Sequence, residues 1–126
     1  MAARLAAIAA ATERVPTMAY ETVKVDIDAR GVATLTFNRP DKHNAMNTQF
    51  CDDMHAALAD LAADSAVRVI VTTGAGESFS AGGDLAWMRA QADGDRAGRM
   101  TEARHFALML RRLDQMPKPV VARVNG

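Results

Sequence analysis

Residues 78–88 read Ser-Phe-Ser-Ala-Gly-Gly-Asp-Leu-Ala-Trp-Met, and this loop is the most informative part of the chain. Gly82 and Gly83 stand directly before a short helical pattern, so the backbone there is free to adopt torsion angles and close approaches that a Cβ atom would block. Amides at the start of a helix have no partner within it and point along the positive end of its dipole. The loop therefore offers donors to an anion or a developing oxyanion. The alternative is a tight turn in which Asp84 only caps the helix.

A second polar loop lies at residues 38–47, which read Asn-Arg-Pro-Asp-Lys-His-Asn-Ala-Met-Asn. Arg39, Lys42 and His43 suit contact with a phosphorylated ligand, although a solvated connector is the alternative that the loop taken alone favours. The two common glycine-rich phosphate loops, G-x-x-x-x-G-K-[ST] and G-x-G-x-x-G, are missing from the sequence.

Hydrophobic periodicity predicts a mixed α/β chain. The expected elements are strands at 20–28 and 32–37 that form an antiparallel hairpin, a helix at 48–63 capped by Asn47, a buried strand at 67–73, a short helix after the Gly82-Gly83 loop, a polar joint at 94–98, a helix at 100–116 and a strand at 120–124. Core faces are expected from Phe50, Met54, Leu58 and Leu61 on the first helix, and from Ala103, Phe106, Leu110 and Leu113 on the last.

Composition excludes several classes of protein. The 126 residues carry fifteen Lys and Arg against fifteen Asp and Glu, and this zero net charge disfavours a binder of nucleic acid or anionic membranes. No stretch approaches the ~20 apolar residues of a membrane span. A single cysteine, Cys51, excludes an internal disulfide. Cys51 and His55 are four residues apart on a predicted helix, which suits a metal or thiolate pair, but the lack of further ligands favours a structural role.

Four segments, taken in order, resemble the enoyl-CoA hydratase/isomerase (crotonase) superfamily. They are residues 38–47, 69–76, 79–85 and 118–126. The resemblance runs from Tyr20 to Gly126 and covers the N-terminal half or less of a typical member. It implies a crotonase-like spiral of ββα units, of which this chain holds the N-terminal part.

We therefore expect residues 18–126 to form a partial crotonase-like domain and the Ala-rich residues 1–17 to lie outside it. Translation from an upstream start codon, with Met18 as the beginning of the fold, is one interpretation of the Ala-rich segment, and a transit peptide is the other. The expected location is the cytoplasm, with the mitochondrion as the alternative.

The resemblance also implies a site for an acyl-CoA thioester. In the family two backbone amides stabilise an enolate-like oxyanion, and the residue before the motif's Asp, here Gly83, supplies the first amide. Many relatives have Ala at this position. Gly83 is a mild departure from that pattern, and it keeps the backbone amide. Ala45 is expected to contact the coenzyme, and Arg39 and Lys42 to screen its phosphates. The expected binding residues are Arg39, Lys42, His43, Ala45, Ala81, Gly82, Gly83, Asp84, Leu85 and Ala86.

The implied activity is that of a hydro-lyase, which adds water to an α,β-unsaturated acyl-CoA. Residues 84–88 resemble the branch that acts on methylglutaconyl-CoA and related branched, carboxylated thioesters, which implies a place in fatty acid or branched-chain amino acid breakdown. Trp87 and Met88 either shape the acyl pocket or serve in packing. Coenzyme A arrives within the substrate, no metal or redox cofactor is expected, and the family assembles as homotrimers or hexamers.

Two alternatives stay open. The family's second oxyanion amide and its catalytic glutamates match no residue before Gly126, so we expect inefficient hydration by this chain alone. A non-catalytic chain that binds acyl-CoA or family subunits is one alternative. Another reaction on the same scaffold, such as double-bond isomerisation, is the other.

Overall fold

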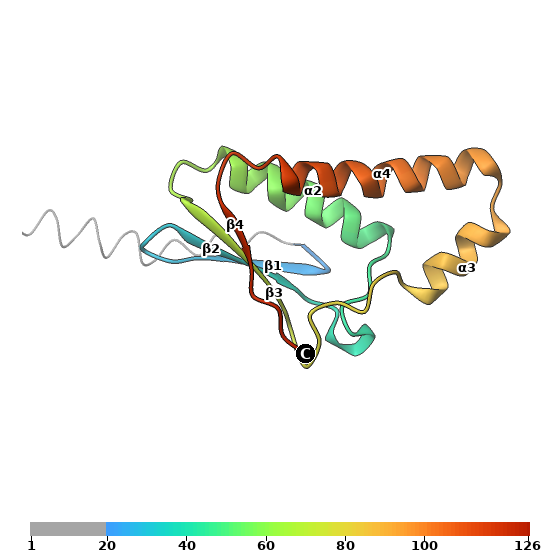
Figure 1. Ribbon diagram of the computed structural model, residues 1–126, viewed down its shortest axis with the longest axis horizontal. Helices are drawn as coiled ribbons and strands as arrows, with labels where there is room; N and C mark the ends of the chain where they lie inside the picture. The colour runs from blue at the N-terminus through green and yellow to red at the C-terminus, as the bar shows by residue number, and fades with distance from the viewer. Residues whose placement is uncertain (1–19) are drawn as a thin grey trace, which may run out of the picture.

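The computed structural model describes residues 20–126, which form a four-stranded sheet with two long helices on one face (Figure 1). The elements in chain order are β1 (Val23–Ile27), β2 (Val32–Phe37), the short 3₁₀ helix η1 (Pro40–Lys42), α2 (Thr48–Ala63), β3 (Val69–Gly74), α3 (Leu85–Asp93), α4 (Arg96–Asp114) and β4 (Val120–Ala122). The expectations for residues 1–17 fall outside the described part of the chain. No helix within residues 20–126 is both long and apolar enough to span a bilayer.

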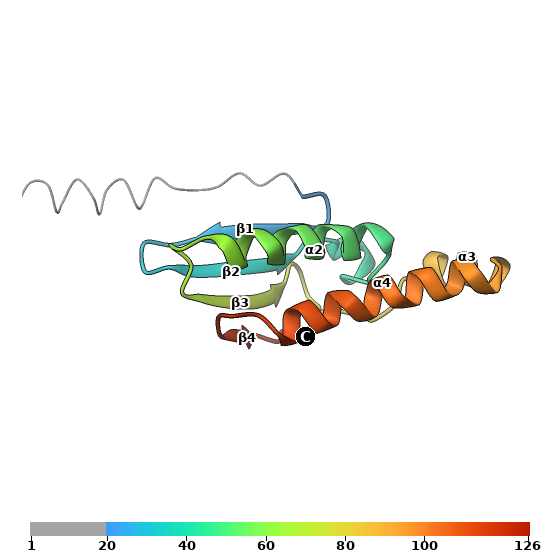
Figure 2. The same cartoon turned by 90° about the horizontal axis from the view of Figure 1, so that it is seen from above.

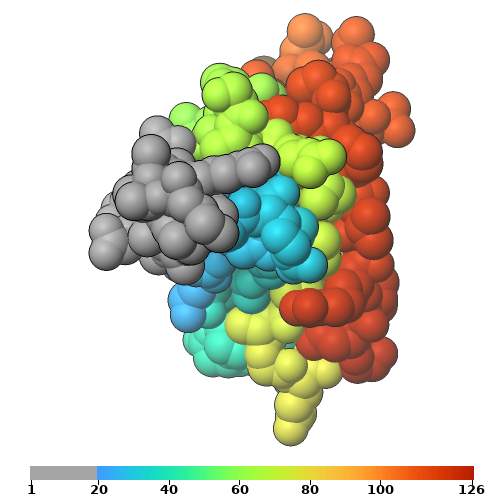
Figure 3. All heavy atoms as spheres, turned by 90° about the vertical axis from the view of Figure 1, so that its left-hand side faces the viewer, coloured from blue at the N-terminus to red at the C-terminus, as the bar shows by residue number. Residues whose placement is uncertain are grey.

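The sheet has the order β1-β2-β3-β4 and mixes two kinds of pairing. β1 and β2 form the predicted antiparallel hairpin, with Val25 opposite Leu35. β3 pairs in parallel with both β2 and β4, and each parallel step needs a crossover. α2 supplies the first crossover, and α3 with α4 supplies the second. Figure 3 shows the β1–β2 turn, the start of β3 and the approach to β4 side by side at one end of the molecule.

The core lies between the sheet and α2, which runs above β1 and β2 with α4 beside it (Figure 2). The predicted core face of α2 is confirmed, because Phe50, Met54, Leu58 and Leu61 are all buried. The predicted cap is confirmed too: the Asn47 side chain accepts a hydrogen bond from the Phe50 amide at 2.9 Å.

The last helix differs from its prediction. α4 begins at Arg96 and not near Met100, because the Asp95 side chain caps it by accepting a hydrogen bond from the Gly98 amide at 2.7 Å. The predicted joint at 94–98 therefore contains only two residues before the helix. The predicted face is also wrong in part: Phe106 and Leu113 pack against the core, but Ala103 and Leu110 are exposed, and the buried residue of α4 is Met109. α4 packs mainly against α2, so a narrow seam decides which residues are buried.

Lys118 closes the C-terminal end of α2 from a distant part of the chain. Its ammonium group donates hydrogen bonds to the carbonyl oxygens of Leu61, at 2.6 Å, and Asp64. The last carbonyl groups of a helix have no partner within it and carry the negative end of the dipole. A cation at this position therefore joins the start of β4 to the end of α2.

We predict that Lys118→Met lowers the free energy of unfolding by about 1.5–3 kcal/mol, because two carbonyl groups lose a charged donor. Urea denaturation measures the effect. Lys24→Met, at an exposed position on β1, is the matched control and should stay within about 0.5 kcal/mol of the unaltered chain. Equal effects of the two substitutions would contradict this role of Lys118.

Candidate functional site

An open groove of about 990 Å³ lies between the η1 loop, the first turn of α2 and α3. Nine of the ten binding residues expected from the sequence line it, and Gly82 is the one that does not. Asn47, Thr48, Gln49, Trp87, Met88 and Arg89 complete the lining. Residues that the sequence places on two separate loops are therefore brought together at one site.

An isolated parallel bridge between Met46 and Gly83 joins the two walls of the groove. The Met46 amide donates to the Gly82 carbonyl oxygen at 2.7 Å, and the Asp84 amide donates to the Met46 carbonyl oxygen at 2.9 Å. The Gly82 carbonyl and the Gly83 N–H belong to one trans peptide group and point in opposite directions, so the Gly83 amide faces away from Met46. It makes no hydrogen bond with any residue of the described range 20–126. The bridge thus leaves one backbone donor free beside the groove.

Asn44 ties the η1 loop to the loop after β3. Its backbone and that of His43 are left-handed, with φ values of 56° and 48°. The buried Asn44 side chain accepts a hydrogen bond from the Arg39 amide at 2.8 Å. It also donates to the carbonyl oxygens of Ala75, at 3.0 Å, and Ser78, at 2.7 Å. These three bonds compensate the backbone strain, which is typical of residues that shape a site.

Asn125 holds the base of the same loop. Its side chain accepts a hydrogen bond from the Gly74 amide at 3.1 Å and donates to the carbonyl oxygens of Gly74, at 3.1 Å, and Gly76, at 3.2 Å. The Phe79 amide donates to the Asn125 carbonyl oxygen at 2.8 Å. The last of the four recognised segments therefore supports the loop that carries Gly83.

Asp84 serves as a helix cap and as an ion-pair partner at once. One carboxylate oxygen accepts a hydrogen bond from the Trp87 amide at 3.0 Å, and the other lies 3.2 Å from the Arg39 guanidinium. The Trp87 hydrogen bond, followed by that of Arg39, holds the pKa of Asp84 below its usual range despite partial desolvation. Asp84 is therefore an anion at neutral pH. The predicted capping role is confirmed, and it coexists with a free amide at Gly83.

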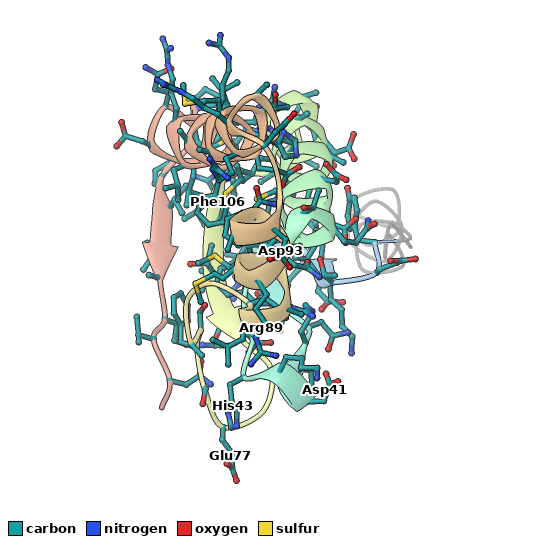
Figure 4. The ribbon with its side chains drawn as sticks, turned by 90° about the vertical axis from the view of Figure 1, so that its right-hand side faces the viewer. Asp41, His43, Glu77, Arg89, Asp93 and Phe106 are labelled. Carbon is teal, nitrogen blue, oxygen red and sulfur yellow. The ribbon has the colours of Figure 1, made fainter. Side chains whose placement is uncertain are left out.

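The groove carries an excess of positive charge. Asp84 is its one acidic lining residue within the described chain, and Arg39 neutralises it. Lys42 and Arg89 also line the groove and form no ion pair within residues 20–126. Figure 4 shows Arg89 on α3 above the loop that carries His43. Arg89 was missed in the sequence, although it lies one helical turn after Leu85 and so shares its face.

Trp87 anchors α3 to its neighbours. Its indole N–H donates to the Glu102 carboxylate at 3.1 Å, and the Thr48 hydroxyl donates to the same oxygen at 2.7 Å. These two bonds, with that of Thr48 the larger influence, hold the pKa of Glu102 below its usual value. The ring also packs near Phe106, with centroids 6.1 Å apart. Trp87 thus has the packing role, while a part in shaping an acyl pocket stays a prediction.

Cys51 and His55 are both engaged within the fold. Cys51 is buried, and burial raises the pKa of its thiol to about 11. His55 uses Nε2 in a hydrogen bond to the His105 carbonyl oxygen at 3.1 Å. No group of three or more metal-ligating side chains occurs in the described part of the chain. Cys51 therefore packs in the core, and His55 joins α2 to α4.

We predict that Cys51 reacts slowly with an aromatic disulfide reagent at pH 7.5, because its thiol is buried and protonated. Urea at unfolding concentrations should raise the rate to that of a model thiol. Absorbance of the released thiolate follows both reactions. A native rate equal to the unfolded rate would show that the thiol is accessible.

Gly82 and Gly83 should tolerate alanine differently. Gly82 has φ +92°, which a side chain rarely adopts, so Gly82→Ala should cost about 1–3 kcal/mol of unfolding free energy. At Gly83 a Cβ atom would meet Met88 at an ordinary 3.7 Å, and Gly83→Ala should be close to neutral. Denaturant titration of the two variants measures the difference, and a reversed order would contradict this geometry.

Comparison with known families points to one group of enzymes. A family model described as enoyl-CoA hydratase/isomerase matches residues 28–126. The chain is 39% identical over 102 residues to 1,2-epoxyphenylacetyl-CoA isomerase of Escherichia coli, covering 77% of this chain and 37% of that protein. It is 37% identical over 100 residues to short-chain-enoyl-CoA hydratase of Clostridium acetobutylicum, covering 75% and 36% respectively. The chain thus spans about two fifths of the length of such curated relatives.

Solved structures give the same result for the fold. An enoyl-CoA hydratase from Shewanella pealeana superposes with a TM-score of 0.82 at 28% identity, covering 94% of this chain and 43% of that one. The enoyl-CoA hydratase of Mycobacterium smegmatis gives 0.77 at 35% identity, covering 82% and 40%. The predicted crotonase-like α/β fold is confirmed for the described residues.

Proposed function

Because the chain belongs to the enoyl-CoA hydratase/isomerase family, we propose that it forms the acyl-CoA-binding part of an enzyme that stabilises an enolate-like oxyanion. The free amide of Gly83 is the observation that carries the proposal. It lies beside the groove, its direction is set by the bridge to Met46, and it has no partner within residues 20–126.

The chemistry follows from this donor. When a nucleophile or base attacks an unsaturated thioester, negative charge develops on the thioester oxygen. A donor already aimed at that oxygen stabilises the charge without reorganising during the reaction, and loss of one such donor costs about 10²–10³ in kcat in known cases. The Gly83 amide is a donor of this kind because the Gly82 carbonyl and the Asp84 amide are both held by hydrogen bonds to Met46.

The charge of the groove suits the rest of the substrate. Lys42 is exposed at the rim beside Ala45, and we assign it to the phosphates of coenzyme A. Arg89 lines the groove from α3, next to the segment 84–88 that resembles hydratases of carboxylated substrates. The positive charge of Arg89 supports our proposal that the acyl group of the substrate is branched and carries a carboxylate, as in the methylglutaconyl type. Coenzyme A then enters as part of the substrate, and no further cofactor is proposed.

Proton transfer needs groups other than Asp84. Hydration requires a general acid and a general base near the reacting carbons. Asp84 is the one carboxylate among the described groove residues, and it is committed to Arg39 and to the cap of α3. We therefore assign this chain substrate binding and oxyanion stabilisation, with hydration as the reaction of the whole family enzyme and a trimer as its assembly.

Isomerisation is the second candidate. The relatives include an isomerase as well as a hydratase. An enolate-like oxyanion serves both reactions, so Gly83 has the same part in each. A non-catalytic binder of acyl-CoA would use the same groove, and turnover of crotonyl-CoA by the purified chain would reject that alternative.

We predict that the chain prefers crotonyl-CoA over the matching thioether, in which a methylene group replaces the carbonyl, by about two- to tenfold in Kd, the worth of one neutral hydrogen bond. Isothermal titration calorimetry measures both affinities. Gly83→Pro, which lacks the N–H, should abolish the preference. Gly83→Ala keeps the N–H and is the matched control.

An equal affinity of the unaltered chain for the two ligands would reject the oxyanion assignment. A preference that survives in Gly83→Pro would reject Gly83 as the donor. Circular dichroism of each variant confirms that it is folded before the titrations are compared.

A further inference from the structure

We propose that Arg39 is a positioning residue for the Gly83 amide and not a ligand of the coenzyme A phosphates. The inference rests on the proposed function, because it concerns how the oxyanion donor is held. It replaces the expectation from the sequence, in which Arg39 and Lys42 share one role.

The direction of the Arg39 side chain is the first argument. Its guanidinium donates to the carbonyl oxygen of Ala45 and to the carboxylate of Asp84, the latter at 3.2 Å. The side chain is 17% exposed, and that of Asp84 is 11% exposed. Arg39 therefore uses these donors in hydrogen bonds within the protein. Lys42, in contrast, is exposed and has no ion pair within residues 20–126, as a phosphate ligand requires.

The position of Asp84 is the second argument. It directly follows Gly83, and three hydrogen bonds hold it: one from its amide to Met46, one from the Trp87 amide and one from Arg39. Two successive glycines leave the chain before it unusually free to rotate. The Gly83 N–H shares a peptide group with the Gly82 carbonyl, which accepts a hydrogen bond from Met46. Its direction therefore depends on how firmly the segments of Met46 and Asp84 are held together. Arg39 supplies the charged part of that restraint.

Removal of Arg39 would disturb this arrangement specifically. Asp84 would keep a mostly buried negative charge without its partner, which is costly. Turning the carboxylate towards water relieves the cost but breaks the cap on Trp87 and shifts the start of α3. A shift of Asp84 would loosen the hydrogen bond of its amide to Met46, and with it the bridge that fixes the Gly83 N–H. Lys42 lies outside this shift.

The contact with Ala45 is the third argument. Ala45 precedes Met46, which forms the bridge to Gly83. One guanidinium thus contacts both walls of the groove, next to the bridge on each side. Arginine suits this task because its planar group has several donors in fixed directions, whereas lysine has one compact charge. Arg39→Lys should therefore restore only part of the effect.

The test separates positioning from phosphate binding by the use of three ligands. Calorimetry measures Kd for crotonyl-CoA, its thioether analogue and free coenzyme A, with the unaltered chain, Arg39→Gln, Arg39→Lys, Asp84→Asn and Lys42→Gln. We expect Arg39→Gln to lose the preference for thioester over thioether and Asp84→Asn, which keeps the cap but loses the ion pair, to reduce it, while the affinity of both for free coenzyme A is unchanged. Arg39→Lys should keep an intermediate preference. Lys42→Gln, the matched cationic control, should weaken all three ligands equally and keep the preference.

Three results would overturn the inference. In the first, Arg39→Gln weakens all three ligands equally, as Lys42→Gln does, and Arg39 is then a phosphate ligand. In the second, Arg39→Gln keeps the thioester preference, and Arg39 then has no influence on the amide. In the third, the unaltered chain shows no preference, and the proposed function fails together with the inference. If Arg39→Gln is unfolded by circular dichroism, Asp84→Asn decides, because it keeps a capping oxygen and removes only the charge of the pair.

Discussion

The bridge between Met46 and Gly83 is the constraint on which the site depends. Two backbone hydrogen bonds, of 2.7 and 2.9 Å, hold loops that lie almost forty residues apart in the chain. They use the Asp84 amide and the Gly82 carbonyl, and because the Gly82 carbonyl shares its peptide group with the Gly83 N–H, that N–H points away from the bridge. The buried side chain of Asn44 and the Arg39–Asp84 pair hold the same two loops from either side. The groove therefore lies between two loops, one of which follows β2 and the other β3.

Local pattern was enough to predict most of the elements. The helix at 48–63 and its Asn47 cap are confirmed, because a cap and an apolar stripe are local signals. The start of α4 was predicted wrongly, since Asp95 is a cap that stands inside a segment interpreted as a polar joint. The buried face of α4 was wrong at Ala103 and Leu110, because a seam against one other helix leaves little periodicity to detect.

The residues of the groove were predictable from the family resemblance, but their partners were not. Arg39 and Asp84 are 45 positions apart, and no local pattern shows that their charges meet. An arginine in a polar loop suits a ligand's phosphate as well as a buried carboxylate, and only the fold distinguishes the two. The contact of Lys118 with the end of α2 joins residues 57 positions apart, and no local pattern shows it either.

The parallel pairing of β3 has a consequence for how the molecule folds. Both of its neighbours reach it through long crossovers, so the contacts that complete the sheet also have large sequence separation. Chains dominated by such contacts pay loop-closure entropy first and fold slowly. The walls of the groove follow the ends of β2 and β3, so a partly folded form without this pairing lacks the site. A thioester that binds there selects the forms that have made the pairing and stabilises them by mass action.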